Sequence, residues 1–248
     1  MIAEKMAKGY DKLALDYGML LDLPFNEGIG ALTRDIAKPH HQDVAFVGPT
    51  WDKVAISNSN VLSFDGGTDY LECPATATAD LDFTFEDYSI GCWVNWEDTG
   101  IVGEIVVGRY DIDVAHSGWE LYLAWNGVVD SLNLRHHHAG TLVPPITGNP
   151  RSSCYSVGWT RGVWCLLGVS RTGGSEALHY RNGVALAMVT SGLVNPETCS
   201  EDLVIGVRWN KIATWYKGKM KRLRIWNRAL SQNDWRNMFE LERYLYSV

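Results

Sequence analysis

One short stretch of the sequence, residues 208–216, is dense in side chains that can bind a sugar. It contains Arg208, Trp209, Asn210, Lys211, Trp215 and Tyr216. Aromatic rings stack on the apolar face of a sugar ring, and amide and guanidinium groups hydrogen-bond to its hydroxyls. We interpret this stretch as an exposed loop and a candidate glycan site. The alternative, which we rank above a glycan site, is that Trp209 and Trp215 cover the edge of a sheet or face a partner protein.

A second group of the same chemistry comes from two separate parts of the chain. It consists of Trp125, Asn126, Trp159 and Arg161. The residue types again suit stacking and hydrogen bonding to a sugar or to a partner protein. Because the four residues are spread over 37 positions, they form a site only if the fold brings two segments together. We therefore expect this group to be the weaker candidate.

Few residues in the sequence have the spacing of metal ligands. Asp65-Gly66-Gly67 has the composition of a turn. In the run His136-His137-His138, the first and third imidazoles point the same way on a strand, but no carboxylate or cysteine lies nearby in the sequence. We expect these histidines to lie on a solvent-facing strand.

The sequence gives little support for catalysis. A glycosidase needs two carboxylates close together across the scissile bond, and no Glu-x-Asp-x-x-Glu run is present. Glu120 is the lone glutamate of its strand. Gly-x-Ser-x-Gly and His-Glu-x-x-His motifs are also missing. We predict that the protein is not an enzyme, and we rank a glycoside hydrolase as the least favoured alternative.

The composition restricts the possible partners and compartments. The 248 residues carry a net charge of -7, and the basic residues cluster only at 217–224, so nucleic acid is not an expected partner. The five cysteines include no Cys-x-x-Cys pair, and Cys92 and Cys165 lie in apolar strands, which is typical of buried thiols. No apolar run resembles a signal peptide or spans a membrane. We expect a protein that is made in the cytoplasm and is not inserted into a membrane. We expect it in a virion or outside the cell only after release.

Short strands separated by turns fill most of the sequence. Residues 88–96 alternate, with Ile90, Cys92 and Val94 on one face and Trp93 on the other. Asn182-Gly183 predicts a tight hairpin turn. Near the end, Ser231 and Asp234 form a capping box that begins a helix over 231–246. The pattern predicts an all-β sandwich or barrel over 19–248, preceded by an N-terminal arm or short helix over 1–18.

Five motifs, in order, resemble those of the laminin-G-like, concanavalin A-like jelly roll, the family of pentraxins and legume lectins. They read LLDLPFNEGIG, VLSFDGGTDYLECP, FEDYSIGCWVNW, VWCLLGVSR with ALHYRNGVAL, and DLVIGVRW with GKMKRLRIWNRALSQNDW. The resemblance spans roughly residues 19–243. It implies a jelly-roll sandwich of two antiparallel sheets, with about six or seven strands each, and a short C-terminal helix. It implies little about function, because sandwiches host many activities.

The closing motif differs from that of the family at two residues that bear on calcium binding. Many relatives hold Ca²⁺ with carboxylates and carbonyls, and Asp65 and Asp69 in FDGGTDY match positions that can contribute, so the resemblance makes them weak calcium candidates. In the alternative, Asp65-Gly66-Gly67 is only a turn. Lys221-Arg222, however, stand here where the family usually has Asp-Glu. Two cations in place of two anions remove ligand charge and add repulsion. We therefore expect no cofactor and disfavour calcium, and we expect Lys221 and Arg222 to pair with nearby acids.

Two functional classes are favoured by the sequence. The first is an accessory or decoration component of a larger assembly such as a virus particle, with protein partners or self-assembly. The second is a soluble carbohydrate-binding lectin module, and the two can coexist in one protein.

Overall fold

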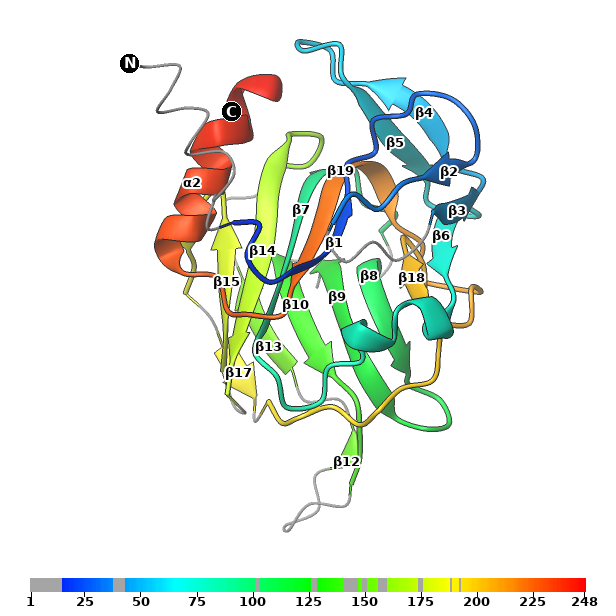
Figure 1. The fold of residues 1–248 in the computed structure, drawn as a ribbon, viewed down its shortest axis with the longest axis vertical. Coiled ribbons are helices and arrows are strands. Elements are labelled where there is room, and N and C mark those ends of the chain that lie inside the picture. The colour runs from blue at the N-terminus through cyan, green and yellow to red at the C-terminus, as the bar shows by residue number, and fades with distance from the viewer. Residues whose placement is uncertain are drawn as a thin grey trace.

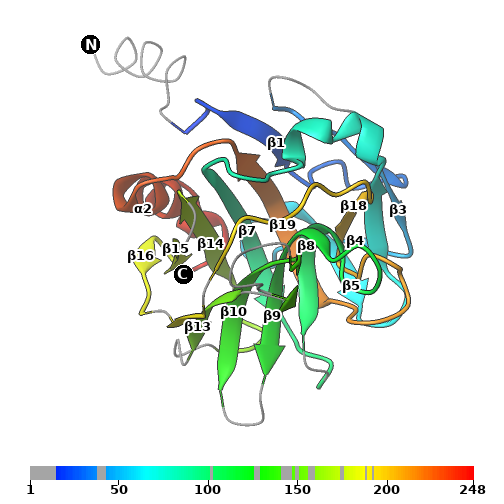
Figure 2. The ribbon, with the colours of Figure 1, turned by 90° about the horizontal axis from the view of Figure 1, so that it is seen from below.

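The computed structural model describes residues 15–37, 43–100, 103–125, 129–140, 147–148, 151–155, 160–173, 176–187, 189–191 and 193–248. Two antiparallel sheets pack face to face, and Figure 2 shows them as separate layers. The predicted jelly-roll sandwich is thus confirmed. One sheet has eight strands and the other nine, more than the six or seven expected. The excess comes from very short strands that extend the sheet edges.

The eight-stranded sheet has the order β16-β15-β14-β7-β19-β5-β4, and β1 also pairs with β19. Its strands are β1 Met19–Leu23, β4 Thr50–Lys53, β5 Asn60–Asp65, β7 Tyr88–Trp96, β14 Cys165–Thr172, β15 Glu176–Arg181, β16 Val184–Ala185 and β19 Lys217–Trp226. The turn between β15 and β16 has positive φ at Asn182 (49°) and Gly183 (75°), which confirms the predicted Asn-Gly hairpin.

The nine-stranded sheet has the order β17-β13-β10-β9-β8-β18-β6-β3-β2. Its strands are β2 Leu32–Thr33, β3 Val44–Val47, β6 Tyr70–Cys73, β8 Glu104–Asp111, β9 Ser117–Trp125, β10 Asp130–His136, β13 Arg151–Tyr155, β17 Val189–Ser191 and β18 Leu203–Ile205. A separate ribbon joins β11 His138–Ala139 to β12 Thr147–Gly148, and 3₁₀ turns lie at Ala75–Ala77, Ala79–Leu81 and Arg243–Leu245.

The core lies between the sheets, and the alternation of each strand decides which side chains enter it. On β7, Ile90, Cys92 and Val94 enter this core, whereas Trp93 belongs to a second apolar cluster on the outer face of the eight-stranded sheet. The predicted facing of this strand is confirmed. Cys92 and Cys165 are buried free thiols, and burial raises the pKa of each to about 12.

Helix α2, Gln232–Glu242, covers that outer face (Figure 1). Ser231 caps it, and the capping box with Asp234 forms as predicted. The helix residues Trp235 and Met238 face the sheet and are fully buried. In the part of the chain that the structure describes, no helix has the length and apolarity to cross a membrane.

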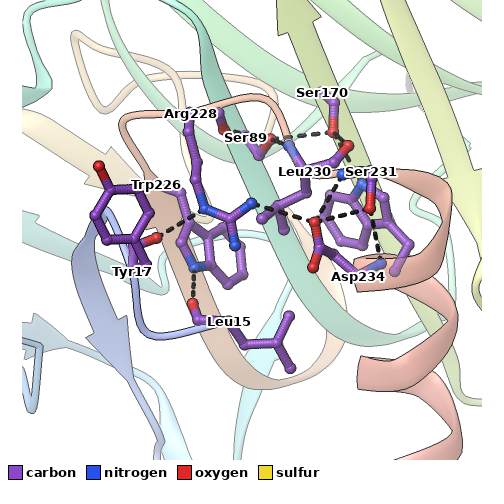
Figure 3. Close-up of polar contacts among 10 residues, drawn as sticks. Leu15, Tyr17, Ser89, Ser170, Trp226, Arg228, Leu230, Ser231 and Asp234 are labelled. Atoms are coloured by element: carbon purple, nitrogen blue, oxygen red, sulfur yellow. Dashed lines mark hydrogen bonds and ion pairs between the residues drawn. The ribbon is translucent and has the colours of Figure 1, made fainter. Parts of the chain in front are cut away.

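A hydrogen-bond network joins this helix to the segment that precedes β1 (Figure 3). Trp226 Nε1 donates to the Leu15 carbonyl at 2.6 Å, and Arg228 Nε donates to the Tyr17 carbonyl at 2.8 Å. Arg228 also pairs with Asp234 at 3.2 Å. Residues more than 200 positions apart are thereby tied together across one corner of the sandwich.

Candidate binding cavity on the nine-stranded sheet

Strands β8, β9 and β10 form the floor of a cavity on the outer face of the nine-stranded sheet. Successive residues of β9 point to opposite faces, so Leu121 and Leu123 enter the core while Glu120 and Tyr122 line the cavity. The cavity has a volume of about 260 Å³. It is lined by Gly103, Ile105, Tyr110, Ile112, Glu120, Tyr122, Ala124, Trp125, Ser131, Asn133, Arg135, Arg208 and Thr214. Its size suits a ligand of about one sugar ring, just below the usual range of small-molecule pockets.

Among the described residues that line this cavity, Glu120 is the only carboxylate, and basic neighbours balance its charge. Arg135 Nη1 lies 3.0 Å and His137 Nε2 3.2 Å from Glu120 Oε1. Burial alone would raise the pKa of Glu120, but the hydrogen bond with His137 and the charge of Arg135 outweigh it and hold that pKa below its ordinary value. Glu120 therefore stays ionised at neutral pH and is a poor proton donor.

Arg135 also fixes the aromatic side of the floor. Its guanidinium lies over the Tyr122 ring, 4.4 Å from the centroid, and its Nη2 donates to Tyr122 Oη at 2.6 Å. The Tyr110 ring stacks on His137 at a centroid separation of 5.0 Å. These contacts hold the floor in one arrangement before any ligand arrives, which lowers the entropic cost of binding.

At the other end of the cavity, Arg161 supports Trp125. The Arg161 guanidinium lies 5.0 Å from the centroid of the Trp125 ring and 5.2 Å from that of Trp96. It forms ion pairs with Asp98 and, at 2.7 Å, with Asp130. Trp125 is thus backed by a cation that is itself held by two carboxylates. Of the second predicted group, the structure brings Trp125 and Arg161 together, whereas Trp159 and Asn126 lie outside the described residues.

The loop 208–216 borders the cavity, and three of its polar side chains converge on one acceptor, whereas Lys211 pairs with Glu72. Arg208 Nη2, Trp209 Nε1 and Asn210 Nδ2 lie 2.5, 3.2 and 3.3 Å from the Asp113 carboxylate. The Ile105 amide donates to the Thr214 carbonyl at 3.2 Å, which attaches the loop to β8. Within the described chain, Arg208 Nε and Thr214 Oγ1 are buried without a hydrogen-bond partner. Both belong to residues that line the cavity.

The prediction that Tyr216 is an exposed binding residue is wrong. Tyr216 is fully buried in the core, with its ring edge-on to Phe64 at 5.6 Å and its Oη donating to the Lys219 carbonyl. It shares the inward face with Met220, so the alternation of β19 already begins at Tyr216. Trp215 is half-buried 6.1 Å from Tyr70 and does not line the cavity.

The three histidines do not face solvent as predicted, because His136, His137 and His138 are all buried. His136 lies between Tyr88 Oη and the Val194 carbonyl, each at 2.6 Å. His138 lies 3.0 Å from Glu197. Across the residues that the structure describes, no three His, Cys, Asp or Glu side chains are grouped as a metal site.

The calcium candidates Asp65 and Asp69 serve a turn. Asp65 Oδ1 accepts hydrogen bonds from the Gly67 amide at 2.7 Å and the Thr68 amide at 2.8 Å. Asp69 Oδ2 accepts from the Asp65 amide at 2.8 Å. These backbone donors occupy the oxygens that a hard cation would need, so the pair fits a turn better than a calcium site. As predicted, Arg222 pairs with acids: Glu242 at 3.0 Å and Asp22 at 3.4 Å. The same prediction for Lys221 is wrong, because its ammonium group donates to two backbone carbonyls and the Asn26 side chain instead of a carboxylate.

Comparisons with known proteins agree with this architecture. A family model described as the concanavalin A-like lectin/glucanases superfamily matches residues 65–234. The comparison with curated protein sequences gave no match. A similar solved structure is domain 4 of AbnA, a GH43 extracellular arabinanase from Geobacillus stearothermophilus, in complex with arabinotriose. That structure has a TM-score of 0.61 and 17% identity, and the match covers 89% of this chain and 97% of that one.

Two toxin structures are also similar. The receptor-binding domain of botulinum neurotoxin mosaic serotype C/D has a TM-score of 0.64 and 13% identity, covering 92% of this chain and 52% of that one. The binding domain of Paraclostridial Mosquitocidal Protein 1 has a TM-score of 0.62 and 11% identity, covering 91% and 52%. The chain thus spans about half the length of these toxin domains. At such identities the likeness shows the fold alone.

Proposed function

This chain belongs to the concanavalin A-like lectin/glucanase superfamily, and we propose that it acts as a non-catalytic carbohydrate-binding module. The proposed module comprises residues 19–248, with residues 1–18 as an arm. The observation that carries the proposal is the cavity on β8, β9 and β10, which is lined by aromatic residues and by two residues, Arg208 and Thr214, that carry unpartnered polar atoms. The arabinotriose bound to domain 4 of AbnA supports the ligand class by analogy.

The charges around the cavity favour an uncharged sugar. Glu120 is paired with Arg135, Arg208 with Asp113, and Arg161 with Asp98 and Asp130. An acidic ligand would have to compete with these ion pairs, whereas a hydroxyl group would not. Sugar hydroxyls both donate and accept, so they match the unpartnered Arg208 Nε donor and Thr214 hydroxyl.

The same cavity argues against hydrolysis. Glycoside hydrolysis requires two carboxyl groups about 5 to 10 Å apart, one of them able to donate a proton. Glu120 is the only carboxylate among the lining residues that the structure describes, and its lowered pKa keeps it ionised. We therefore propose binding without bond cleavage, independent of any bound metal.

The direct test is binding of neutral and acidic oligosaccharides, measured on a glycan array and then by calorimetry. Replacing Trp125→Ala removes the stacking surface and should weaken binding about tenfold, equivalent to about 1.4 kcal/mol. Thr214→Val keeps the side-chain shape but removes the hydroxyl, and should also weaken binding. Trp215→Ala is the matched control, because Trp215 lies in the same loop outside the cavity lining. An array without any hits, or equal losses for all three variants, would refute the proposal.

A role in a larger assembly such as a virus particle is a second proposal. It draws on exposed apolar side chains around the edge strand β2, namely Ile29 (80% exposed), Leu32 (50%), Ile36 (57%) and Val47 (54%). Such residues at a sheet edge favour contact with a protein partner or a second copy. Size-exclusion chromatography with light scattering should then detect an oligomer that Leu32→Lys dissociates. A monomer at all concentrations would exclude self-assembly.

A further inference from the structure

Lys221 on β19 is a buried lysine whose ammonium group is enclosed by oxygen atoms. Only 5% of the residue is exposed. Its Nζ donates to the Phe25 carbonyl at 3.1 Å, to the Asn60 carbonyl at 2.5 Å and to Asn26 Oδ1. Three N–H donors therefore meet three oxygen acceptors, which satisfies the ammonium group completely.

A bulge in β19 directs this lysine into its position. The pairing of β19 with β7 shifts register between Lys221 and Arg224, and Arg222 has a left-handed φ of 52°. A bulge re-aims the side chains around it. Arg222 thereby reaches Asp22 and Glu242, while Lys221 reaches the segment after β1 and the start of β5.

The oxygen cage is built by two segments that also hold each other. Asn60 Nδ2 donates to the Asn26 carbonyl at 2.7 Å. Gly28 permits this approach, because a Cβ at that position would lie 2.4 Å from Asn60 Nδ2. Burial lowers the pKa of Lys221 to about 8, and the charge of Glu27 opposes that shift, so the amine is still mainly protonated at neutral pH. The corner thus contains one positive charge surrounded by carbonyl and amide oxygens.

Carbonyl and amide oxygens are the ligands that replace the water shell of a hard cation. We propose that this cage is a cation site that the chain fills with its own ammonium group, so that Lys221 takes the place of a bound ion. This corner of the sandwich then needs no exogenous metal. The inference rests on the cage alone and is independent of the proposed carbohydrate binding.

The test is to empty the cage and offer it other cations. Lys221→Ala should lower the melting temperature, and ammonium or potassium chloride should restore part of that loss in a saturable manner. Tetramethylammonium chloride at equal ionic strength should not, since the ion is too large for the cage. Lys221→Met should be destabilised without any restoration, because its side chain fills the space without charge. Lys219→Ala removes a partly exposed lysine two residues earlier, which pairs with Asp52, and controls for the general salt effects of losing a lysine.

A Lys221→Ala variant that folds but responds equally to all salts would overturn the proposal. Should that variant not fold, the wild-type protein provides a second measurement. Nitrogen-15 spectra of the lysine side chains at pH 6 should show one ammonium group whose hydrogens exchange slowly with water. Rapid exchange at every lysine would overturn the proposal equally.

Discussion

His136 lies between the two sheets, where it is fully buried against Tyr88 and the Val194 carbonyl. Burial lowers its pKa to about 3, and the hydrogen bond to Val194 only partly opposes that shift. His179, buried beside Ser152, has its pKa lowered by burial to about 4. Both values lie below the unfolded value of about 6.5. At a pH between the folded and the unfolded pKa of these histidines, the unfolded chain binds protons that the folded chain does not.

The fold should therefore lose stability as the pH falls from about 6.5 toward 4. Each histidine should contribute on the order of a few kcal/mol, because one pKa unit corresponds to about 1.4 kcal/mol. Urea unfolding of the wild type and of His179→Gln at several pH values measures the effect. The variant should show a shallower dependence on pH than the wild type. Parallel curves of stability against pH for the wild type and His179→Gln would contradict a lowered pKa of His179.

Helix α2 depends on a flat patch in the sheet beneath it. Gly91 and Gly168 pair across β7 and β14, and the Trp235 indole lies on this pair. A Cβ on Gly168 would be 2.1 Å from Trp235 Cη2. Trp235 Nε1 also donates to Ser170 Oγ at 2.9 Å, which fixes the position of the ring. The helix can pack this closely only because both positions under the ring lack side chains.

Gly168→Ala should lower the free energy of unfolding by about 1–3 kcal/mol, the usual cost of overpacking a core. Chemical denaturation measures the change. Gly67→Ala is a suitable control, because a Cβ there would meet its nearest neighbour at 3.8 Å and the backbone has no positive φ. In a Trp235→Leu background the cost of Gly168→Ala should shrink. An undiminished cost would mean that the indole is not the obstacle.

Local pattern was sufficient to predict most of the elements. Alternation identified the bounds and facing of β7, and the Ser231–Asp234 spacing identified the start of α2. The binding candidates were harder, because their partners lie far along the chain. The three consecutive donors of the loop meet Asp113 about 95 residues earlier, and His136 meets Val194 58 residues later. The burial of Tyr216 can be predicted from the sequence, since Tyr216 shares the parity of Met220 on β19.

At the scale of the whole molecule, the segment that begins at Leu15 and the C-terminal helix meet at the outer face of the eight-stranded sheet. Trp93, Trp226 and Trp235 are fully buried there in one apolar cluster. Glu242, at the end of α2, binds Trp93 Nε1 at 2.6 Å and Arg224 at 2.7 Å. β19 lies between β7 and β5 and also pairs with β1, so the sheet cannot be completed until the last strand is made. Such long-range pairing is typical of slowly folding proteins.

Removing residues 231–248 should therefore leave β19 in place but expose the cluster that α2 covers. The expected product is a chain that binds a hydrophobic dye, scatters light and melts without a sharp transition, because a large exposed apolar patch favours association. A chain that ends at Tyr246 is the control: it keeps the Tyr246 ring stacked on Trp93 at 4.0 Å and should melt like the wild type. A shortened chain that stays monomeric and melts cooperatively would show that the sandwich is stable without its helix. The helix would then be an addition to the fold, and the ties of Trp226 to Leu15 and of Arg228 to Tyr17 would have to hold the corner alone.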